Sequence, residues 1–260
     1  AERSRPPVPA TVFYIAALPE VGETAVLDGK EGHHAATVRR IAVGERLTLS
    51  DGTGEFAEAS VVATQRDRLD LTVSRRWTAR RPTPTVTLVQ ALPKSERSEL
   101  AVELATEAGI DRIVPWQASR CVSRWEGPKA HKGTAKWRAA ALAAAKQSRR
   151  AFVPVVDDLH DTAAVVGLVR NAVADGNVVA ALHESASHRF ADLPVADASG
   201  VVLIVGPEGG LDDRELAKLV DSGASTVVLG PTVLRTSTAA AVALGALGVL
   251  TRRWDEPPPQ

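Results

Sequence analysis

The chain of 260 residues is poor in sulfur and in aromatic residues: it has one cysteine, Cys121, no methionine, one tyrosine and an aromatic content of 4%. A single cysteine excludes an internal disulfide and any zinc site built from several cysteines. We expect Cys121 to be a small buried apolar residue. The adjacent histidines His33 and His34 cannot easily face one ion, and no spaced carboxylate completes a site with His183. The sequence therefore predicts no metal.

Long hydrophobic runs are also absent. No stretch reaches the roughly 18 apolar residues of a membrane span, and residues 1–10, AERSRPPVPA, lack the apolar core of a secretory signal. We therefore expect no membrane partner and a cytoplasmic location. The content of 45% hydrophobic and 24% charged residues is typical of a chain that folds, and the length allows one large or two modest domains.

The chain has no net charge, but its charges are unevenly distributed. Residues 112–150 contain ten Lys or Arg and one acidic residue, Glu126, whereas residues 161–260 contain seven basic and twelve acidic residues. The basic stretch is a candidate surface for a polyanion. Its sequence KWRAAALAAAKQSRR equally favours a solvated helix with cations near its end.

Residues 1–80 contain short apolar runs separated by turn signals such as Asp51-Gly52-Thr53-Gly54, a pattern that predicts a small antiparallel β-barrel. Residues 31–44, EGHHAATVRRIAVG, are the exception and favour a short helix. The segment RRPTPTV at 80–86 is typical of an extended linker. We therefore place a domain boundary after residue 80.

Residues 81–260 alternate strand and helix patterns, which predicts an α/β domain with a parallel sheet. The expected strands are 86–92, 112–116, 153–158, 178–183, 201–206 and 226–230. The expected helices are 95–109, 134–150, 162–174, one between 212 and 223, and 237–250. Asp212 or Asp213 can cap the fourth helix, and Gly223 can end it.

Two of these strands run into Gly-Pro, in LIVGPEGG (203–210) and VVLGPTVLRTST (227–238). Glycine-rich turns after strands often hold phosphate, but Glu208 would repel a polyphosphate. Because ligands lie at the carboxyl ends of parallel strands, we expect both loops at one rim with ALHE (181–184). The hydroxyls after Arg235 can cap the last helix. Glu208 could instead accept backbone N–H groups, and Arg235 could anchor its loop through an ion pair.

Together, GPEGG (206–210) and LGPTVLRT (229–236) resemble the signature of the SPOUT-class RNA methyltransferases. More closely, they resemble the RsmE family, bacterial enzymes that methylate N3 of a uridine in 16S ribosomal RNA. Residues 91–122 and KQSRR (146–150) are similar to that family as well, so the resemblance covers nearly the whole chain. Many relatives have Arg-Thr-Glu-Thr where this chain has Ser237, so no carboxylate base is expected there. Two other positions also differ: many relatives have an acidic residue or a cysteine where this chain has Lys146, and a lysine where it has Leu104.

The resemblance implies a PUA-like RNA-binding barrel over residues 1–80 and a SPOUT methyltransferase domain with a deep trefoil knot over residues 81–260. It also implies S-adenosylmethionine as methyl donor, a homodimer, and 16S ribosomal RNA as substrate, within the small ribosomal subunit. The residues expected to bind the cofactor are Leu182, His183, Val205, Gly206, Pro207, Glu208, Gly209, Gly210, Leu229, Gly230, Pro231, Val233, Leu234, Arg235, Thr236 and Ser237.

Arg235 is the candidate catalytic residue, because a fixed cation can stabilise the charge that develops on a uracil carbonyl oxygen. The candidates for RNA contacts are Lys94, Arg97, Gln147, Arg149 and Arg150, with Arg39 and Arg40 from the barrel. Two other functions remain open. One is a SPOUT methyltransferase that acts on another RNA, and the other is a non-catalytic RNA-binding factor in ribosome assembly.

Overall fold

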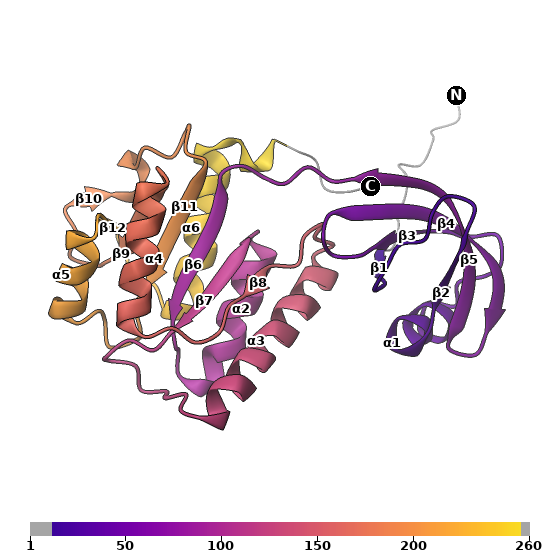
Figure 1. The fold of residues 1–260 in the computed structure, drawn as a ribbon, viewed down its shortest axis with the longest axis horizontal. Coiled ribbons are helices and arrows are strands. Elements are labelled where there is room, and N and C mark those ends of the chain that lie inside the picture. Colours follow the sequence, from indigo (N-terminus) through magenta and orange to yellow (C-terminus); the bar gives the residue numbers. More distant parts are fainter. Residues whose placement is uncertain (1–11, 256–260) are drawn as a thin grey trace. The chain divides into compact units, whose positions relative to one another are not determined.

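The computed structural model describes residues 12–255, in which the chain forms two compact units (Figure 1). The first unit consists of residues 12–81 and 149–152, and the second of residues 82–148 and 153–255. Residues 149–152 thus belong to the first unit, which a single boundary after residue 80 does not anticipate. Within residues 12–255, no helix is both long enough and apolar enough to cross a membrane.

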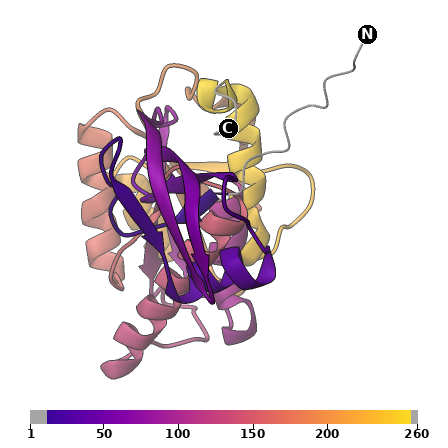
Figure 2. The same ribbon diagram turned by 90° about the vertical axis from the view of Figure 1, so that its right-hand side faces the viewer.

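The first unit is built on a five-stranded sheet in the order β1-β3-β4-β5-β2, and its two long strands, β4 and β5, are the long purple arrows in Figure 2. The strands are β1 (Val12–Tyr14), β2 (Thr24–Leu27), β3 (Arg46–Ser50), β4 (Glu55–Gln65) and β5 (Arg68–Thr78). All neighbours are antiparallel except β1 and β3, so the expectation of wholly antiparallel strands is wrong at β1. The helix expected within residues 31–44 is α1 (Gly29–Gly32), which continues into a π-helical turn, His33–Val38.

Alternation along β5 directs its apolar side chains to one face of this sheet. Leu69, Leu71 and Val73 of β5 pack in one apolar cluster with Ala57 and Ala59 of β4, and all five are buried. Since successive side chains of a strand point to opposite faces, the residues between them face away from this cluster. Apolar residues at alternate positions of β4 and β5 therefore form a large part of the core of the first unit.

The second unit contains a seven-stranded parallel sheet in the order β10-β12-β9-β11-β6-β7-β8, as its strand and helix alternation predicts. Its strands are β6 (Thr85–Ala91), β7 (Arg112–Trp116), β8 (Val155–Val156), β9 (Val178–Leu182), β10 (His188–Arg189), β11 (Gly200–Val205) and β12 (Ser225–Val228). The short strand β10 was not expected. All six residues of the central strand β11 are buried, so both faces of the sheet are covered.

The helices of the second unit fall into two groups. They are α2 (Ser98–Glu107), α3 (Pro128–Gln147), α4 (Thr162–Ala174), α5 (Asp213–Asp221) and α6 (Thr236–Leu250). Helix α2 packs against both α3 and α6, and α4 packs against α5 (Figure 1). Short 3₁₀ turns occur at Ser95–Arg97, Phe190–Asp192 and Arg252–Trp254.

Helix α3 differs from its expected range of 134–150 at both ends. It begins at Pro128. Proline suits the first helical turn because an N–H at that position would have no acceptor within the helix, so its absence costs nothing. Gly133 lies inside the helix, where a Cβ would come within 2.6 Å of the Trp125 ring. The helix ends at Gln147, and Arg149 adopts a φ of 55°, which no right-handed helix contains.

The start of α6 also corrects an expectation. Its N-cap position is Arg235, and no side chain among the described residues caps the helix, so the hydroxyls of residues 236–238 do not act as the cap. Thr236 already lies in the first turn, and its hydroxyl bonds to Gly206 and Gln90 instead. By contrast, the Asp212 side chain accepts the N–H of Arg214 at 3.0 Å and caps α5 as expected.

Candidate active site

The carboxyl ends of β9, β11 and β12 meet at one rim of the sheet and enclose a cavity of about 780 Å³. The expected cofactor residues that line it are Leu182, His183, Val205, Gly206, Pro207, Glu208, Gly209, Gly210, Leu229, Val233, Leu234, Arg235 and Thr236. Lys94 and Arg97, predicted to contact RNA, line the same cavity. The structure therefore brings together four segments that are far apart in the sequence, within residues 94–97, 182–183, 205–210 and 229–236.

Several predicted residues lie elsewhere. Gly230 and Pro231 are exposed and Ser237 is buried within α6, and none of the three lines this cavity. Gln147 is exposed at the end of α3. The remaining candidates for RNA contacts belong to the first unit: Arg39, Arg40, Arg149 and Arg150.

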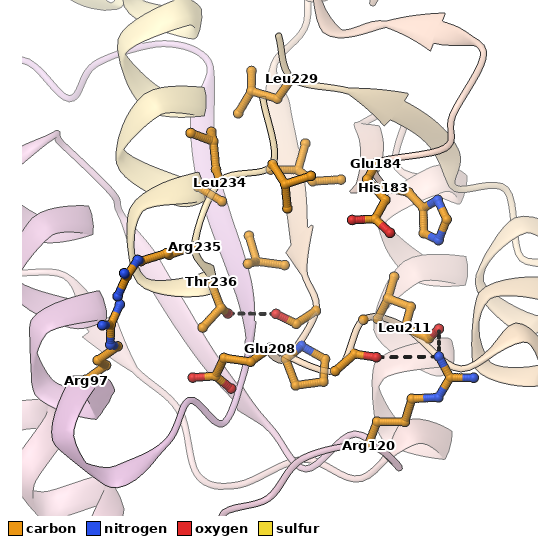
Figure 3. A pocket seen from close by; sticks show the side chains of 18 of the residues that line it. Arg97, Arg120, His183, Glu184, Glu208, Leu211, Leu229, Leu234, Arg235 and Thr236 are labelled. Atoms are coloured by element: carbon orange, nitrogen blue, oxygen red, sulfur yellow. Dashed lines mark hydrogen bonds between the residues drawn. The ribbon is translucent and has the colours of Figure 1, made fainter. Parts of the chain in front are cut away.

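One hydroxyl joins the two Gly-Pro loops. Thr236 Oγ1 donates to the Gly206 carbonyl oxygen at 2.6 Å, shown as a dashed line in Figure 3, and accepts from Gln90 Nε2 at 2.9 Å. The same Gln90 nitrogen donates to the Ala91 carbonyl at 3.0 Å. These hydrogen bonds lie in the interior, because the Gln90 side chain is 1% and the Thr236 side chain 6% exposed. The end of β6, the end of β11 and the start of α6 are thus connected at the base of the cavity.

The glycine-rich loop after β11 forms a tight turn, in which the N–H of Gly210 donates to the Pro207 carbonyl at 2.9 Å. Gly210 has a φ of 74°, a conformation that favours glycine. The Glu208 carboxylate accepts the backbone N–H of Lys94 at 3.0 Å, so it serves as a backbone acceptor and also lines the cavity. This interaction explains how a carboxylate is accommodated in a loop of glycines.

Arg120 holds the far side of the glycine-rich loop, and the sequence reasoning missed it. Its Nη1 donates to the carbonyl of Leu211 at 3.1 Å and to that of Gly209 at 3.5 Å, and its Nη2 lies 3.7 Å from Asp212 Oδ2 (Figure 3). No local pattern marks Arg120, because its partners lie some ninety positions along the chain. Its place inside the family-like stretch 91–122 was the one available signal.

A buried carboxylate fixes the segment that carries Arg120. Glu215, in the first turn of α5, is 6% exposed and accepts three hydrogen bonds. The donors are the Ser119 N–H at 2.9 Å, the Ser119 hydroxyl at 2.9 Å and the Thr162 hydroxyl at 2.6 Å. Because the carboxylate binds both groups of Ser119, the neighbouring Arg120 is held in place beside the loop.

Positive charge gathers at one side of the cavity. Figure 3 shows Arg235 directed toward Arg97, with His183 and Glu184 on the opposite side. Arg97 lies 3.9 Å from the Glu96 carboxylate. No ion pair or side-chain hydrogen bond of Arg235 occurs within the described part of the chain, which argues against a role as a loop anchor. A guanidinium without a partner in a cavity is available to an anionic or carbonyl group.

The remaining walls suit a ligand with an apolar ring and a positive charge. Leu182, Val205, Leu229 and Leu234 supply apolar surface, with Val205 almost fully buried. Glu184, Glu208 and Asp213 supply carboxylates. The cavity thus combines apolar side chains with many charged ones, and its volume is in the usual range for a cofactor site. Its residues fit S-adenosylmethionine, which has an adenine ring, an amino group and a sulfonium.

Comparison with known proteins matches a domain family to each of the two units. The family model of an RNA methyltransferase domain matches residues 80–248, and that of an RNA methyltransferase PUA domain matches residues 27–74. The fold and the site thus define the class: the chain is a member of the RNA methyltransferases that carry a PUA domain.

Individual relatives narrow the class. The chain is 56% identical to ribosomal RNA small subunit methyltransferase E of Mycobacterium tuberculosis, over 95% of this chain and 94% of that protein. It is 31% identical to the Bacillus subtilis protein of the same name, over 89% of this chain and 92% of that protein. The chain belongs to the ribosomal RNA small subunit methyltransferase E family.

Solved structures agree with this assignment. Ribosomal RNA small subunit methyltransferase E from Neisseria gonorrhoeae, bound to S-adenosylmethionine, has a TM-score of 0.82 and 25% identity, over 93% of this chain and 98% of that chain. A protein from Legionella pneumophila, solved with the same cofactor, has a TM-score of 0.81 and 29% identity, over 94% and 99%.

Proposed function

We propose that this chain transfers a methyl group from S-adenosylmethionine to N3 of a uridine in 16S ribosomal RNA. The observation that carries the proposal is the cavity at the strand ends, lined by both Gly-Pro loops and by Arg235, whose side chain has no partner among residues 12–255. Membership of the ribosomal RNA small subunit methyltransferase E family supports the same reaction. Small ribosomal subunits are cytoplasmic, so this substrate would place the reaction in the cytoplasm.

The cofactor would lie against the residues that end β9, β11 and β12. Leu182, Leu229 and Leu234 offer apolar contacts to its adenine, and the loop of Gly206–Gly210 allows close approach of the backbone. Glu184 and Asp213 complement its amino group and sulfonium. When bound, S-adenosylmethionine supplies an electrophilic methyl group.

Arg235 would act on the uridine. N3 of uracil becomes a nucleophile when its proton leaves, and the negative charge then spreads to the carbonyl oxygens. A guanidinium held at the cavity stabilises this charge best where water is excluded. To reach the cavity the base must leave its stack, so Arg235 also helps to select a flipped-out uridine.

Replacing Arg235 by alanine tests this role. We expect the rate of methyl transfer to 16S ribosomal RNA to fall by at least about 100-fold, as for the loss of one transition-state donor. The calorimetric Kd for S-adenosylmethionine should change less than about threefold, because Arg235 is only one of many expected cofactor residues and its guanidinium is proposed to act on the uridine. Arg214→Ala, an exposed arginine of α5 that does not line the cavity, is the matched control. Methylation by Arg235→Ala at the control rate would remove Arg235 from the reaction.

RNA binding would draw on the predicted basic residues of both units. Lys94 and Arg97 lie at the cavity, where they can hold the phosphates that flank the target uridine. The further contacts we propose are Arg39, Arg40, Gln147, Arg149 and Arg150. Phosphate contacts of this kind make the affinity fall steeply as salt increases.

The finer features of the fold are proposals as well. We propose that the sheet of the first unit closes into a PUA-like barrel over residues 1–80 and that the SPOUT domain, residues 81–260, threads its last segment into a trefoil knot. The position of Thr236 against Gly206 supports the threading. We also propose a homodimer, supported by the exposed Val242, Val249 and Leu250 of α6, and sedimentation velocity would detect it.

A further inference from the structure

An aromatic stack lies on the face of β4 and β5 that is turned away from the core of the first unit. Phe56 and Trp77 are directly paired across the two strands, and their rings stack at 5.5 Å between centroids with an interplanar angle of 9°. Ala57, the neighbour of Phe56, belongs to the core cluster, so Phe56 faces the other way. Phe56 is nevertheless fully buried.

The segment 149–152 extends this stack along the same pair of strands. Phe152 bridges to Thr53, just before β4, and its ring covers Gly54, where a Cβ would come within 2.4 Å of it. The Gly54 carbonyl accepts the N–H of Ala79, the residue after β5, at 2.7 Å. Phe152 thus continues, at the ends of β4 and β5, the row that begins with Phe56 and Trp77.

An arginine covers each end of this row. Arg75 Cζ lies 4.7 Å from the centroid of the Trp77 ring, and Arg81 Cζ lies 4.2 Å from that of Phe152. Arg76, on the opposite face of β5, pairs with Glu20 at 2.5 Å and with Glu55 at 3.5 Å. Arg75 and Arg81 have no carboxylate partner within residues 12–255, so their charges are uncompensated.

The acidic residue nearest in register is already engaged. Glu58 pairs with Arg75 across the strands, but its carboxylate accepts the Ser74 hydroxyl at 3.2 Å and lies 3.7 Å from Arg46 Nη1. This face of the first unit is therefore cationic, with planar groups held over rings.

We propose that this arginine–aromatic surface, formed by Arg75, Trp77, Arg81 and Phe152, binds an unpaired stretch of the RNA substrate. The proposal rests on the proposed function, because it takes the substrate to be RNA. A guanidinium supported by a ring offers its outer face to a nucleobase and its N–H edge to phosphate. The rings of Phe56 and Phe152 are buried, which leaves little apolar surface to enter a lipid layer.

Two of the four residues of this surface lie between the recognised domains, and the other two, Arg81 and Phe152, lie within the methyltransferase match. The PUA match ends at residue 74 and the methyltransferase match begins at residue 80, so Arg75 and Trp77 belong to neither. Phe152 comes from the methyltransferase part of the chain but packs in the first unit. RNA contact at this place is therefore not implied by either domain alone.

The double variant Arg75→Gln/Arg81→Gln tests the surface, with Arg170→Gln/Arg214→Gln as the control that removes the same two charges from exposed helix positions. The probe is unmodified 16S ribosomal RNA transcribed in vitro, and the full-length protein is titrated at several salt concentrations. Loss of stacking on one base weakens binding about 5- to 150-fold. We expect at least tenfold weaker binding and a salt slope lower by about 1.4 for the two lost contacts. The Kd for S-adenosylmethionine should not change.

Two further variants separate stacking from charge and from folding. Arg75→Lys/Arg81→Lys should restore the salt slope but not the affinity, because an ammonium cannot stack. If Arg81→Gln loosens the segment 149–152, Arg75→Gln alone must still weaken RNA binding about fivefold, since its ring partner lies on its own strand.

The proposal is overturned if the glutamine variant binds RNA like the control, or if the lysine variant binds as tightly as the natural protein. Polyglutamate serves as a second probe that stands for an acidic protein segment. If the glutamine variant bound polyglutamate more weakly but RNA as tightly as the control, the surface would bind acidic protein and the proposal would be overturned. RNA binding is measured without methyl transfer. If the protein did not methylate uridine, the proposed function would be contradicted, but the RNA affinities of these variants would still test the surface.

Discussion

Replacing Thr236 by valine should loosen the cofactor cavity, because it removes the hydroxyl that joins β6, β11 and α6. The Gly206 carbonyl loses a donor at 2.6 Å, and the Gln90 amide loses an acceptor at 2.9 Å while keeping its bond to Ala91. A buried group left without its partner costs about 1–3 kcal/mol. With two groups affected, we expect the free energy of unfolding of the second unit to fall by roughly 2–4 kcal/mol.

Urea unfolding followed by tryptophan fluorescence measures this loss. The tryptophans of the second unit are Trp116, Trp125, Trp137 and Trp254, and the first unit contains only Trp77, so the signal reports mainly the second unit. Because the same hydroxyl sets the spacing of the two loops, the calorimetric Kd for S-adenosylmethionine should rise at least about tenfold, which corresponds to about 1.4 kcal/mol.

Two variants make the test specific. Thr238→Val is the matched control, since Thr238 lies in the same helical turn and its side chain makes no hydrogen bond within the described residues; its effect should stay within about 0.5 kcal/mol. Thr236→Ser keeps the hydroxyl and should restore cofactor affinity. If Thr236→Val matches Thr238→Val in both stability and Kd, the connection between the loops has no energetic role and the reasoning is refuted.

Two other predictions follow from buried polar groups. Burial raises the pKa of Tyr14, the one tyrosine of the chain, from 10.0 to about 12; its absorbance should titrate there in the folded protein and near 10 in denaturant. The folded state holds the phenol proton more tightly than the unfolded state. Its contribution to the free energy of unfolding is therefore complete below pH 10, and roughly 2–3 kcal/mol is lost as the pH rises through 12. An absorbance midpoint near 10 in the folded protein would contradict this prediction. Asp111→Ala should cost about 3–5 kcal/mol in urea unfolding, because it leaves the Arg253 guanidinium, paired at 2.9 Å, buried without its carboxylate. Adding Arg253→Met should recover part of the loss, and strictly additive losses would show that the two groups are not coupled.

Local signals in the sequence were enough to predict much of the second unit. Helix α4 occupies residues 162–174 as expected, and Asp212 caps α5 because an N-cap needs only a neighbouring N–H. The two Gly-Pro loops meet at one rim because parallel strands place their carboxyl ends together. These features depend on residues close in sequence or on the general geometry of a sheet.

Features that depend on distant contacts were not predicted. The Thr236 hydroxyl faces Gly206 and Gln90 instead of capping its helix, since a buried carbonyl and amide compete for it. Arg120 reaches loop carbonyls of residues 209 and 211. Residues 149–152 pack in the first unit because Phe152 finds a glycine there, and nothing near Phe152 in the sequence indicates that contact.

Mass mapping of modified nucleosides in 16S ribosomal RNA tests the central claim most directly, using cells with and without the gene for this chain. We predict that deletion removes one 3-methyluridine, that the natural gene restores it, and that a gene encoding Arg235→Ala does not. Retention of every 3-methyluridine in the deleted strain would contradict uridine-N3 methylation by this protein.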